Sequence, residues 1–280
     1  MKQLAVLITC HNRRVTTLKC LQALYACTVP EGYSLEVFLV DDGSADGTGD
    51  TVRMQYSAVH VIEGDGNLYW NQGMHLAWET AAKTAEYDFY LWLNDDTIID
   101  KNALTELIEN YNEAFKIDNK PAIIVGTCRS DVGKNEFSYG GRNDTGLILP
   151  NGQLQESKYI NGNLVLVPKV IFKQIGMLSN DYTHTLGDND YGLRAIQSGF
   201  KCYASKHYIA TCSPNLGVPG WFNPKNSLKK RWQLLHSPKG LNIKEYNKYR
   251  KKFWGNKWII FALKAYLKTI IPSLYGRISK

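Results

Sequence analysis

The chain has 280 residues, of which 44% are hydrophobic and 21% are charged, with 33 Lys and Arg against 26 Asp and Glu. This composition excludes a disordered or fibrous chain, and the length suits one large domain or two small ones. The net charge of +7 is unevenly placed, because residues 225–280 hold 15 basic residues and one acid, Glu245. That tail carries +14 and residues 1–224 carry −7. An acidic body with a basic tail indicates a catalytic domain followed by a segment that binds something anionic.

Apolar runs and helical spacing alternate along the first part of the chain. Residues 4–8, 35–40, 59–62 and 89–93 are predicted strands, and residues 15–25, 71–83 and the segment from about 101, capped by Asp100, are predicted helices. This alternation predicts an α/β fold with a mostly parallel open sheet. Ligands of such sheets bind beyond the carboxyl ends of the strands.

The second part of the chain is less regular. Residues 129–157 are rich in Gly and Asn and predict hairpins or an insertion. A regular apolar run returns at 162–167. It is followed by a predicted helix that begins near Pro168 and by another after residues 188–190. A Gly/Pro-rich stretch at 214–224 and the change in charge predict a domain boundary near residue 224, with 1–224 as the body and 225–280 as the tail.

Cysteine usage and hydropathy bear on location. The six cysteines form no CxxC pair and no Cys/His zinc pattern, so we expect reduced structural thiols and a reducing compartment. Residues 4–10 are too short for a secretion signal, and the apolar run at 258–263 is too short to span a membrane. We therefore expect a cytoplasmic protein, peripheral at the inner face of the cell membrane.

Acidic clusters follow two of the predicted strands. They are DDGS at 41–44 and NDD at 94–96, and a third cluster, GDNDYGLR, occupies 187–194 at a loop-to-helix boundary. Adjacent carboxylates repel one another unless a cation compensates them, which favours a hard metal such as Mg²⁺ or Mn²⁺. An ordinary turn or a helix N-terminus remains the alternative for each cluster. The chain has no dinucleotide-binding fingerprint and no P-loop.

Taken together and in order, these motifs resemble those of the family 2 glycosyltransferases. The resemblance rests on TCHN at 9–12, DDGS at 41–44, NQG at 71–73, NDD at 94–96 and DNDYGLR at 188–194, and it covers residues 3–212 or so. It implies the GT-A fold, a nucleotide-sugar donor and inversion of the anomeric centre. Within the family, the chain looks most similar to the rhamnosyltransferase-like enzymes of bacterial surface polysaccharide synthesis.

The resemblance also implies roles for particular residues. Residues 1–128 would form the nucleotide-sugar half and 129–224 the acceptor half. Asp96 would hold a Mg²⁺ or Mn²⁺ ion that bridges the diphosphate. The donor-binding residues would be Thr9, His11, Asn12, Asp41, Asp42, Asn71 and Asp95.

The catalytic base implied by the resemblance is Asp188. The family usually has Glu before this Asp, whereas here Gly187 precedes it, so Asp190 is a rival for the base. Many members have a metal-binding His where this chain has Thr211, and His207 lies four residues earlier, which leaves the metal ligands open. The chemistry fits these roles, since a metal can stabilise the departing diphosphate and one carboxylate can take the proton from the attacking hydroxyl.

The tail suggests a docking element. Trp221 and Phe222, just before it, are candidate acceptor contacts. In the predicted helix from about 257, Ile260, Leu263, Leu267, Ile270, Ile271 and Leu274 share one face and Lys257, Lys264 and Lys268 another. This pattern is typical of an amphipathic helix on an anionic membrane. Packing against the catalytic domain or a second subunit, as in a homodimer, and nucleic-acid binding are the alternatives; the wide apolar face argues against nucleic acid.

The sequence thus predicts an inverting, metal-dependent glycosyltransferase. Its donor would be dTDP-rhamnose or a UDP-sugar, and its acceptor a hydroxyl of a lipid-linked glycan in O-antigen or capsule synthesis. The alternatives are a sugar nucleotidyltransferase, which usually has a Gly-rich basic loop after the first strand, and a non-catalytic membrane scaffold that binds sugar nucleotides.

Overall fold

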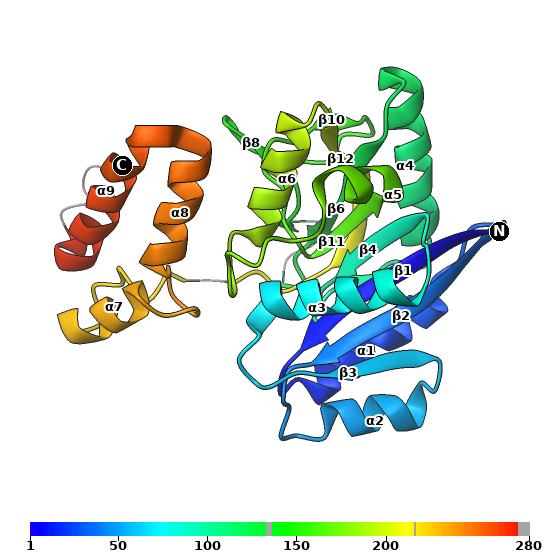
Figure 1. Ribbon diagram of the computed structural model, residues 1–280, viewed down its shortest axis with the longest axis horizontal. Coiled ribbons are helices and arrows are strands. Elements are labelled where there is room, and N and C mark those ends of the chain that lie inside the picture. Colours follow the sequence, from blue (N-terminus) through cyan, green and yellow to red (C-terminus); the bar gives the residue numbers. More distant parts are fainter. Residues whose placement is uncertain (133–135, 216, 274–280) are drawn as a thin grey trace.

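A computed structural model describes residues 1–132, 136–215 and 217–273. Its centre is a mixed sheet in the order β10-β12-β6-β11-β4-β1-β2-β3 (Figure 1). Four consecutive strands of this order, from β4 to β3, run parallel, as expected for apolar runs buried on both faces. They are β1 (Lys2–Cys10), β2 (Tyr33–Asp41), β3 (Val59–Glu63) and β4 (Phe89–Leu93).

The other half of the sheet is formed later in the chain. β11 (Leu164–Pro168) runs antiparallel between β4 and β6 (Ala122–Arg129), and β12 (Lys201–Thr211) is parallel to β6. The sequence predicts hairpins or an insertion in the turn-rich stretch after β6, and residues 142–143 and 146–147 do pair there as a hairpin. The short strands are β5 (Ile98–Ile99), β7 (Phe137–Tyr139), β8 (Arg142–Asn143), β9 (Gly146–Leu147) and β10 (Gln155–Glu156).

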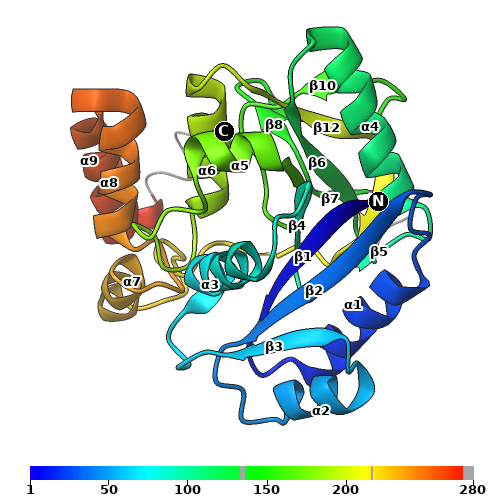
Figure 2. The ribbon, with the colours of Figure 1, turned by 45° about the vertical axis from the view of Figure 1, so that its right-hand side comes forward.

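Helices cover both faces of the sheet (Figures 1 and 2). On one face α1 (Arg14–Ala26), α2 (Thr48–Gln55) and α4 (Ala103–Asp118) bury their apolar residues. On the other face lie α3 (Tyr69–Thr84), α5 (Lys169–Ile175) and α6 (Gly187–Gln197). The predicted α/β fold with a largely parallel sheet is confirmed.

Some local predictions differ from the structure. Asp100 does not cap α4, since no side chain caps that helix and both Asp100 oxygens accept from Arg129, at 2.6 and 2.9 Å. The helix predicted after residues 188–190 begins earlier, at Gly187, so Asp188 and Asp190 lie in its first turn.

In the part that the structure describes, residues 225–273, the tail is mostly helical and includes a short 3₁₀ turn, Gly255–Lys257. α7 (Leu228–Leu235), α8 (Ile243–Trp254) and α9 (Trp258–Ile270) stand beside the α/β body, with α8 between α6 and α9 (Figure 1). Within the described residues, no helix combines the length and apolar character needed to cross a bilayer. Leu274, which the sequence places on the apolar face of α9, lies outside the described residues.

Candidate active site

A cavity of about 810 Å³ opens where the carboxyl ends of β1, β2 and β4 meet. Parallel strands bring the residues that follow them to one edge of the sheet, which is why motifs far apart in the sequence meet here. Six of the predicted site residues line this cavity: Thr9, His11, Asp42, Asp95, Asp96 and Asp188.

Asp42 organises the wall formed after β3. One carboxylate oxygen accepts from the backbone N–H groups of Gly66 at 2.8 Å and Leu68 at 3.2 Å, and the other accepts from Tyr69 at 2.9 Å. His11 donates from Nδ1 to the Asp42 carbonyl oxygen at 2.5 Å. These bonds fix the backbone of the cavity wall around a buried carboxylate.

Three predicted donor-binding residues do not line the cavity. Asp41 accepts from the N–H of Gly49 at 2.8 Å, in the first turn of α2. Asn12, in a left-handed conformation at φ 52°, accepts from Ala45 N–H at 2.7 Å. Asn71 is fully buried and donates to the carbonyl oxygens of Ser179 and Tyr182, at 2.8 and 2.6 Å. Their contacts brace the loops that carry the lining residues.

Arg13 lies between the paired carboxylates after β4. Its Nη1 is 2.9 Å from Asp95 Oδ1 and 2.9 Å from Asp96 Oδ2. Asp95 is almost completely buried, and this burial raises its pKa to about 6, although Arg13 opposes the shift. Asp96 is more exposed than Asp95 and belongs to the cavity wall. The chain thus compensates its two adjacent acids with an arginine of its own.

The surroundings of Asp96 suit a metal that is shared with a substrate. Among the described residues, no group of three or more His, Cys, Asp or Glu is placed to hold an ion. Thr211 ends β12, and the next residue, Cys212, has its sulfur 3.6 Å from Asp96 Oδ1, with a pKa raised by burial to about 12. Mg²⁺ commonly binds one or two carboxylates plus substrate phosphates, and Asp95 and Asp96 meet that requirement. His207 instead contacts Glu106 at 2.9 Å.

The two candidate bases in α6 have different surroundings. Asp188 lines the cavity and accepts from Gly162 N–H at 3.1 Å and from its neighbour Asn189 N–H at 2.7 Å. Burial raises the pKa of Asp188, and these hydrogen bonds oppose the shift. Of the two acids, Asp188 is the one that lines the cavity.

Asp190 is fully buried and does not belong to the cavity wall. One oxygen accepts from Lys252 at 2.6 Å and from the Tyr182 hydroxyl at 3.0 Å, and the other accepts from Arg194 at 2.7 Å. A carboxylate with this many cationic and hydroxyl partners is fixed in place and has no free path to an acceptor.

Trp221 and Phe222, the candidate acceptor contacts, lie with the tail helices. Their rings are 4.6 Å apart, and Trp221 lines a separate cavity of about 180 Å³ with residues of α8 and α9. Neither lines the larger cavity. A contact with acceptor by these two residues stays a prediction.

Among the lining residues that the sequence reasoning missed, two are basic, Arg13 and Lys239. Arg13 directly follows the first motif, and two consecutive arginines beside so many acids were a usable signal. Lys239 comes from the tail, in the connection between α7 and α8. No local pattern marks it, because only the packing of the tail brings it to the cavity.

Comparison with known proteins identifies the family. The family model described as glycosyl transferase family 2 matches residues 5–168, more than half of the chain. The chain belongs to glycosyl transferase family 2. The family resemblance seen in the motifs is therefore confirmed.

Two curated relatives of this family 2 chain are poly-beta-1,6-N-acetyl-D-glucosamine synthases. One from Staphylococcus epidermidis is 26% identical over 186 residues, which cover 64% of this chain and 42% of that protein. One from Staphylococcus aureus (strain COL) is 29% identical over 129 residues, which cover 46% of this chain and 29% of that protein. The chain spans less than half the length of these relatives.

Solved structures with the same fold include two complexes with nucleotide sugars. A mannosyltransferase from Pyrobaculum calidifontis, in complex with GDP-Man and Mn²⁺, has a TM-score of 0.58 at 13% identity, covering 94% of this chain and 73% of that one. S. aureus TarS 1-349, in complex with UDP-GlcNAc, has a TM-score of 0.56 at 14% identity, covering 96% and 79%. The fold of this family 2 chain is GT-A, as the motifs implied.

Proposed function

We propose that this chain transfers a sugar from a nucleotide-sugar donor to a hydroxyl group of a glycan acceptor, with inversion. The observation that supports this most directly is the composition of the larger cavity, which joins the motif residues Thr9, His11 and Asp42 to the carboxylates Asp95, Asp96 and Asp188. The family membership and the nucleotide-bound neighbours favour the same function.

Asp188 is the proposed base. It removes the proton from the acceptor hydroxyl as that oxygen attacks the anomeric carbon, and the bond to the diphosphate breaks on the opposite face. Direct displacement with a single base inverts the anomeric centre and needs no covalent intermediate. The hydrogen bonds from Gly162 and Asn189 orient the carboxylate without neutralising it.

Asp96, with Asp95 beside it, is the proposed site for Mg²⁺ or Mn²⁺. When bound, such an ion would stabilise the negative charge of the departing diphosphate. Asp95 and Asp96 would each exchange their contact with Arg13 for one with the ion or with the ligand. We expect Asp96→Ala to abolish the gain in nucleoside-diphosphate affinity that Mn²⁺ gives the parent protein, measured by calorimetry. Full activity of the parent in excess EDTA would contradict a metal role.

The donor and acceptor are proposed from the relatives. TarS is solved with UDP-GlcNAc, and the curated relatives are named as synthases of an N-acetyl-glucosamine polymer. We therefore propose a UDP-sugar as donor, with UDP-GlcNAc tested first and dTDP-rhamnose as the alternative that the motifs suggested. The acceptor is proposed to be a lipid-linked glycan in polysaccharide synthesis.

The outer face of α9 is the proposed membrane contact, which would place the protein at the inner face of the cell membrane. Its large apolar side chains are about half exposed: Ile259, Ile260, Leu263, Leu267, Ile270 and Ile271. Lys257 and Lys264 are exposed on the same helix or at its start, so the surface suits anionic lipids. Ala262, Ala265 and Thr269 are buried on its inner face. This inner face packs mainly against α7 and α8 of the tail itself.

The proposed function is tested by a screen followed by an assay. Melting temperatures would be measured with UDP, GDP, dTDP and the corresponding nucleotide sugars, with and without Mn²⁺. Nucleotides with one particular nucleobase should raise the melting temperature. The matching donor should then release its nucleoside diphosphate when a glycan acceptor is added. Formation of a sugar nucleotide from a sugar phosphate would favour a nucleotidyltransferase, and binding without turnover would favour a scaffold.

A further inference from the structure

The tail contributes a positive charge to the main cavity. Lys239 lines its wall together with Tyr69 and His184, and its Nζ lies 6.0 Å from the centre of the Tyr69 ring. Burial lowers the pKa of His184, and the positive charge of Lys239 lowers it further. The ammonium group of Lys239 therefore lies near His184, at the cavity wall. Lys239 therefore faces the same space as the motif residues.

The pairing of charges around the cavity leaves Lys239 available to bind an anionic ligand. Among the lining residues that the structure describes, Arg13 and Lys239 are the two with a permanent positive charge. Arg13 is paired with Asp95 and Asp96. The described part of the chain shows no ion pair for Lys239, although four carboxylates line the cavity. An anionic ligand entering this acidic site needs a cation that is not already neutralised.

The backbone at Lys239 is held firmly. The neighbouring Gly240 donates to Ser237 O at 3.0 Å, and a Cβ at Gly240 would lie 1.6 Å from the carbonyl oxygen of Leu234. Leu235 and Ile243, on either side of this turn, are buried in the small core of the tail. Because the turn is fixed, the lysine side chain starts from a defined point at the cavity rim.

Helix α8 fastens this turn to the loop that precedes the proposed base. Glu245 accepts from the Thr183 hydroxyl at 2.6 Å and from the Thr183 N–H at 3.0 Å. The next residue after Thr183 is His184, at the cavity wall. At the other end of α8, Lys252 binds Asp190 at 2.6 Å. The single acid of the tail thus joins it to the active-site loop.

We propose that Lys239 binds the diphosphate of the donor, so that the C-terminal segment completes the donor site. Lysine is a common point-charge ligand for phosphate, and its flexible stem lets it follow the diphosphate as the sugar bond breaks. This assignment rests on the proposed function, because it requires a nucleoside-diphosphate ligand. It gives the basic tail a role inside the catalytic site as well as at a membrane.

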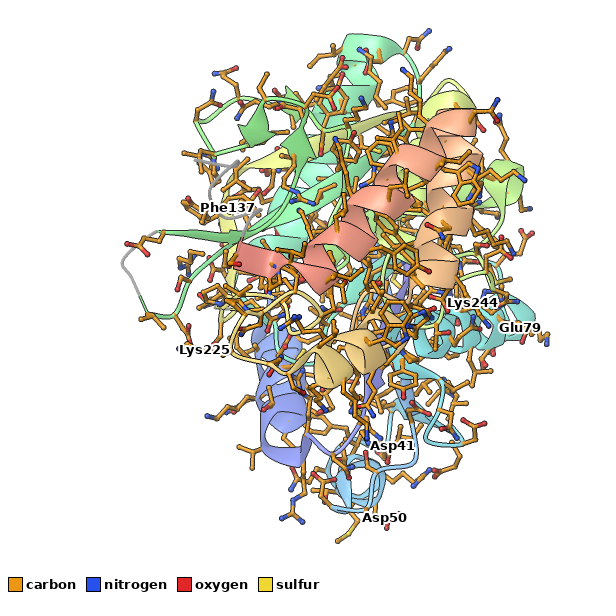
Figure 3. All side chains as sticks on the ribbon, turned by 90° about the vertical axis from the view of Figure 1, so that its left-hand side faces the viewer. Asp41, Asp50, Glu79, Phe137, Lys225 and Lys244 are labelled. Atoms are coloured by element: carbon orange, nitrogen blue, oxygen red, sulfur yellow. The ribbon has the colours of Figure 1, made fainter. Side chains whose placement is uncertain are left out.

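The test compares Lys239→Ala with Lys244→Ala in the full chain. Lys244 lies in the first turn of α8 (Figure 3), is exposed and does not line the cavity, so its loss removes the same charge from the same segment. Calorimetry would measure the affinity of each protein for UDP, GDP and dTDP in the presence of Mn²⁺. For the diphosphate that binds, the affinity for the corresponding nucleoside would be measured as well. Melting temperatures of both variants would confirm that they fold.

Lys239→Ala should weaken nucleoside-diphosphate binding by about tenfold while leaving binding of the nucleoside unchanged. Lys239→Arg should restore most of the affinity, and Lys244→Ala should bind as tightly as the parent. Added salt should reduce the difference in affinity between the parent and Lys239→Ala, because salt screens the charge. Equal affinities for Lys239→Ala and Lys244→Ala would overturn the assignment and leave the proposed function standing. A parent protein that binds none of the three diphosphates would overturn both.

Discussion

Asp188 and Asp190 lie two residues apart in the first turn of α6, and their surroundings separate their roles. Asp188 faces the cavity and is held by two backbone N–H groups. Asp190 is enclosed by Arg194, Lys252 and Tyr182 and is fully buried. A helix turn carries the two side chains in different directions, so Asp188 faces the cavity and Asp190 joins the body to the tail through Lys252.

The two aspartates should therefore respond differently to the same substitution. Asp188→Asn should reduce transfer by about 10²- to 10⁴-fold, the usual contribution of a general base, with nucleoside-diphosphate binding retained. Asp190→Asn should lower the free energy of unfolding by about 3–5 kcal/mol, because it leaves buried cations without their carboxylate. Turnover assays and chemical denaturation would measure these effects. A fully active Asp188→Asn protein would refute the assigned base, and an inactive but stable Asp190→Asn protein would favour its rival.

The pH profile offers a second check on Asp188. Burial raises its pKa above that of an unperturbed aspartate, about 3.9, and the base works only when ionised. As pH falls through the raised pKa, the ionised fraction falls, so kcat/KM should drop at a higher pH than an ordinary aspartate would give. The measurement is kcat/KM against pH, with the melting temperature followed over the same range. An acid limb at or below about pH 3.9 in a folded protein would contradict the raised pKa.

The sequence identified the acidic motifs, and the family resemblance favoured Asp188 as the base, but Asp190 stayed a rival. Both follow the same strand and loop, and the family pattern of an acid before Asp188 is missing because Gly187 stands there. The partners that enclose Asp190 include Lys252, which is 62 residues away. Only the folded chain shows that distant contact. Lys239 escaped prediction for the same reason.

At the scale of elements, the start of α6 depends on a close packing with α3. Leu186, before the helix, has a left-handed conformation with φ 76°. A Cβ at Gly187 would lie 1.7 Å from Asn71 Oδ1, and Asn71 in turn holds the carbonyl oxygens of Ser179 and Tyr182. The glycine therefore makes room for the side chain that anchors the loop before Asp188.

Gly187→Ala should lower the free energy of unfolding by about 1–3 kcal/mol, because the added methyl group displaces Asn71. Denaturant unfolding would measure this loss. The double variant Asn71→Ala/Gly187→Ala should be less destabilised than the sum of the two single variants, since the clash is gone once Asn71 is shortened. Additive effects would show that the two residues do not interact in this way.

The elements that the sequence predicted best are those with strong apolar patterns. The parallel strands β1 to β4, the helices α1 and α3, and β11 all fall where the runs and spacings placed them. Helix α2 was not predicted because Val52 is its one buried large side chain. Strand β6 was missed even though Ala122–Arg129 is mostly apolar, and α7 and α8 were hidden in a sequence dominated by charge. Polar helices form here because tertiary contacts hold them.

At the scale of the whole molecule, the basic tail uses its charge in two ways. Part of it neutralises the acidic body, through Lys248 with Asp181 and Lys252 with Asp190. Helix α9 lies on the outer side of α8, away from the body, and its apolar face remains exposed (Figures 1 and 3). These ion pairs join the tail to the body, while exposed apolar side chains together with Lys257 and Lys264 form the outer surface at α9.

This outer surface predicts binding to anionic membranes. The parent protein should sediment with vesicles containing phosphatidylglycerol and much less with phosphatidylcholine alone, because lysines and apolar side chains act together. Replacing Ile260, Leu263 and Leu267 with Ser should weaken this binding by at least about tenfold, since their exposed apolar surface no longer enters the lipid.

The matched control replaces Val15 and Met54, on α1 and α2, which are 65% and 86% exposed. Val15→Ser/Met54→Ser removes exposed apolar surface from the body and should leave sedimentation unchanged. Equal sedimentation of the α9 variant and the parent would reject docking through this face. If the parent fails to sediment but forms a dimer that the α9 variant loses, the face instead binds a second copy of the chain, and the membrane proposal falls.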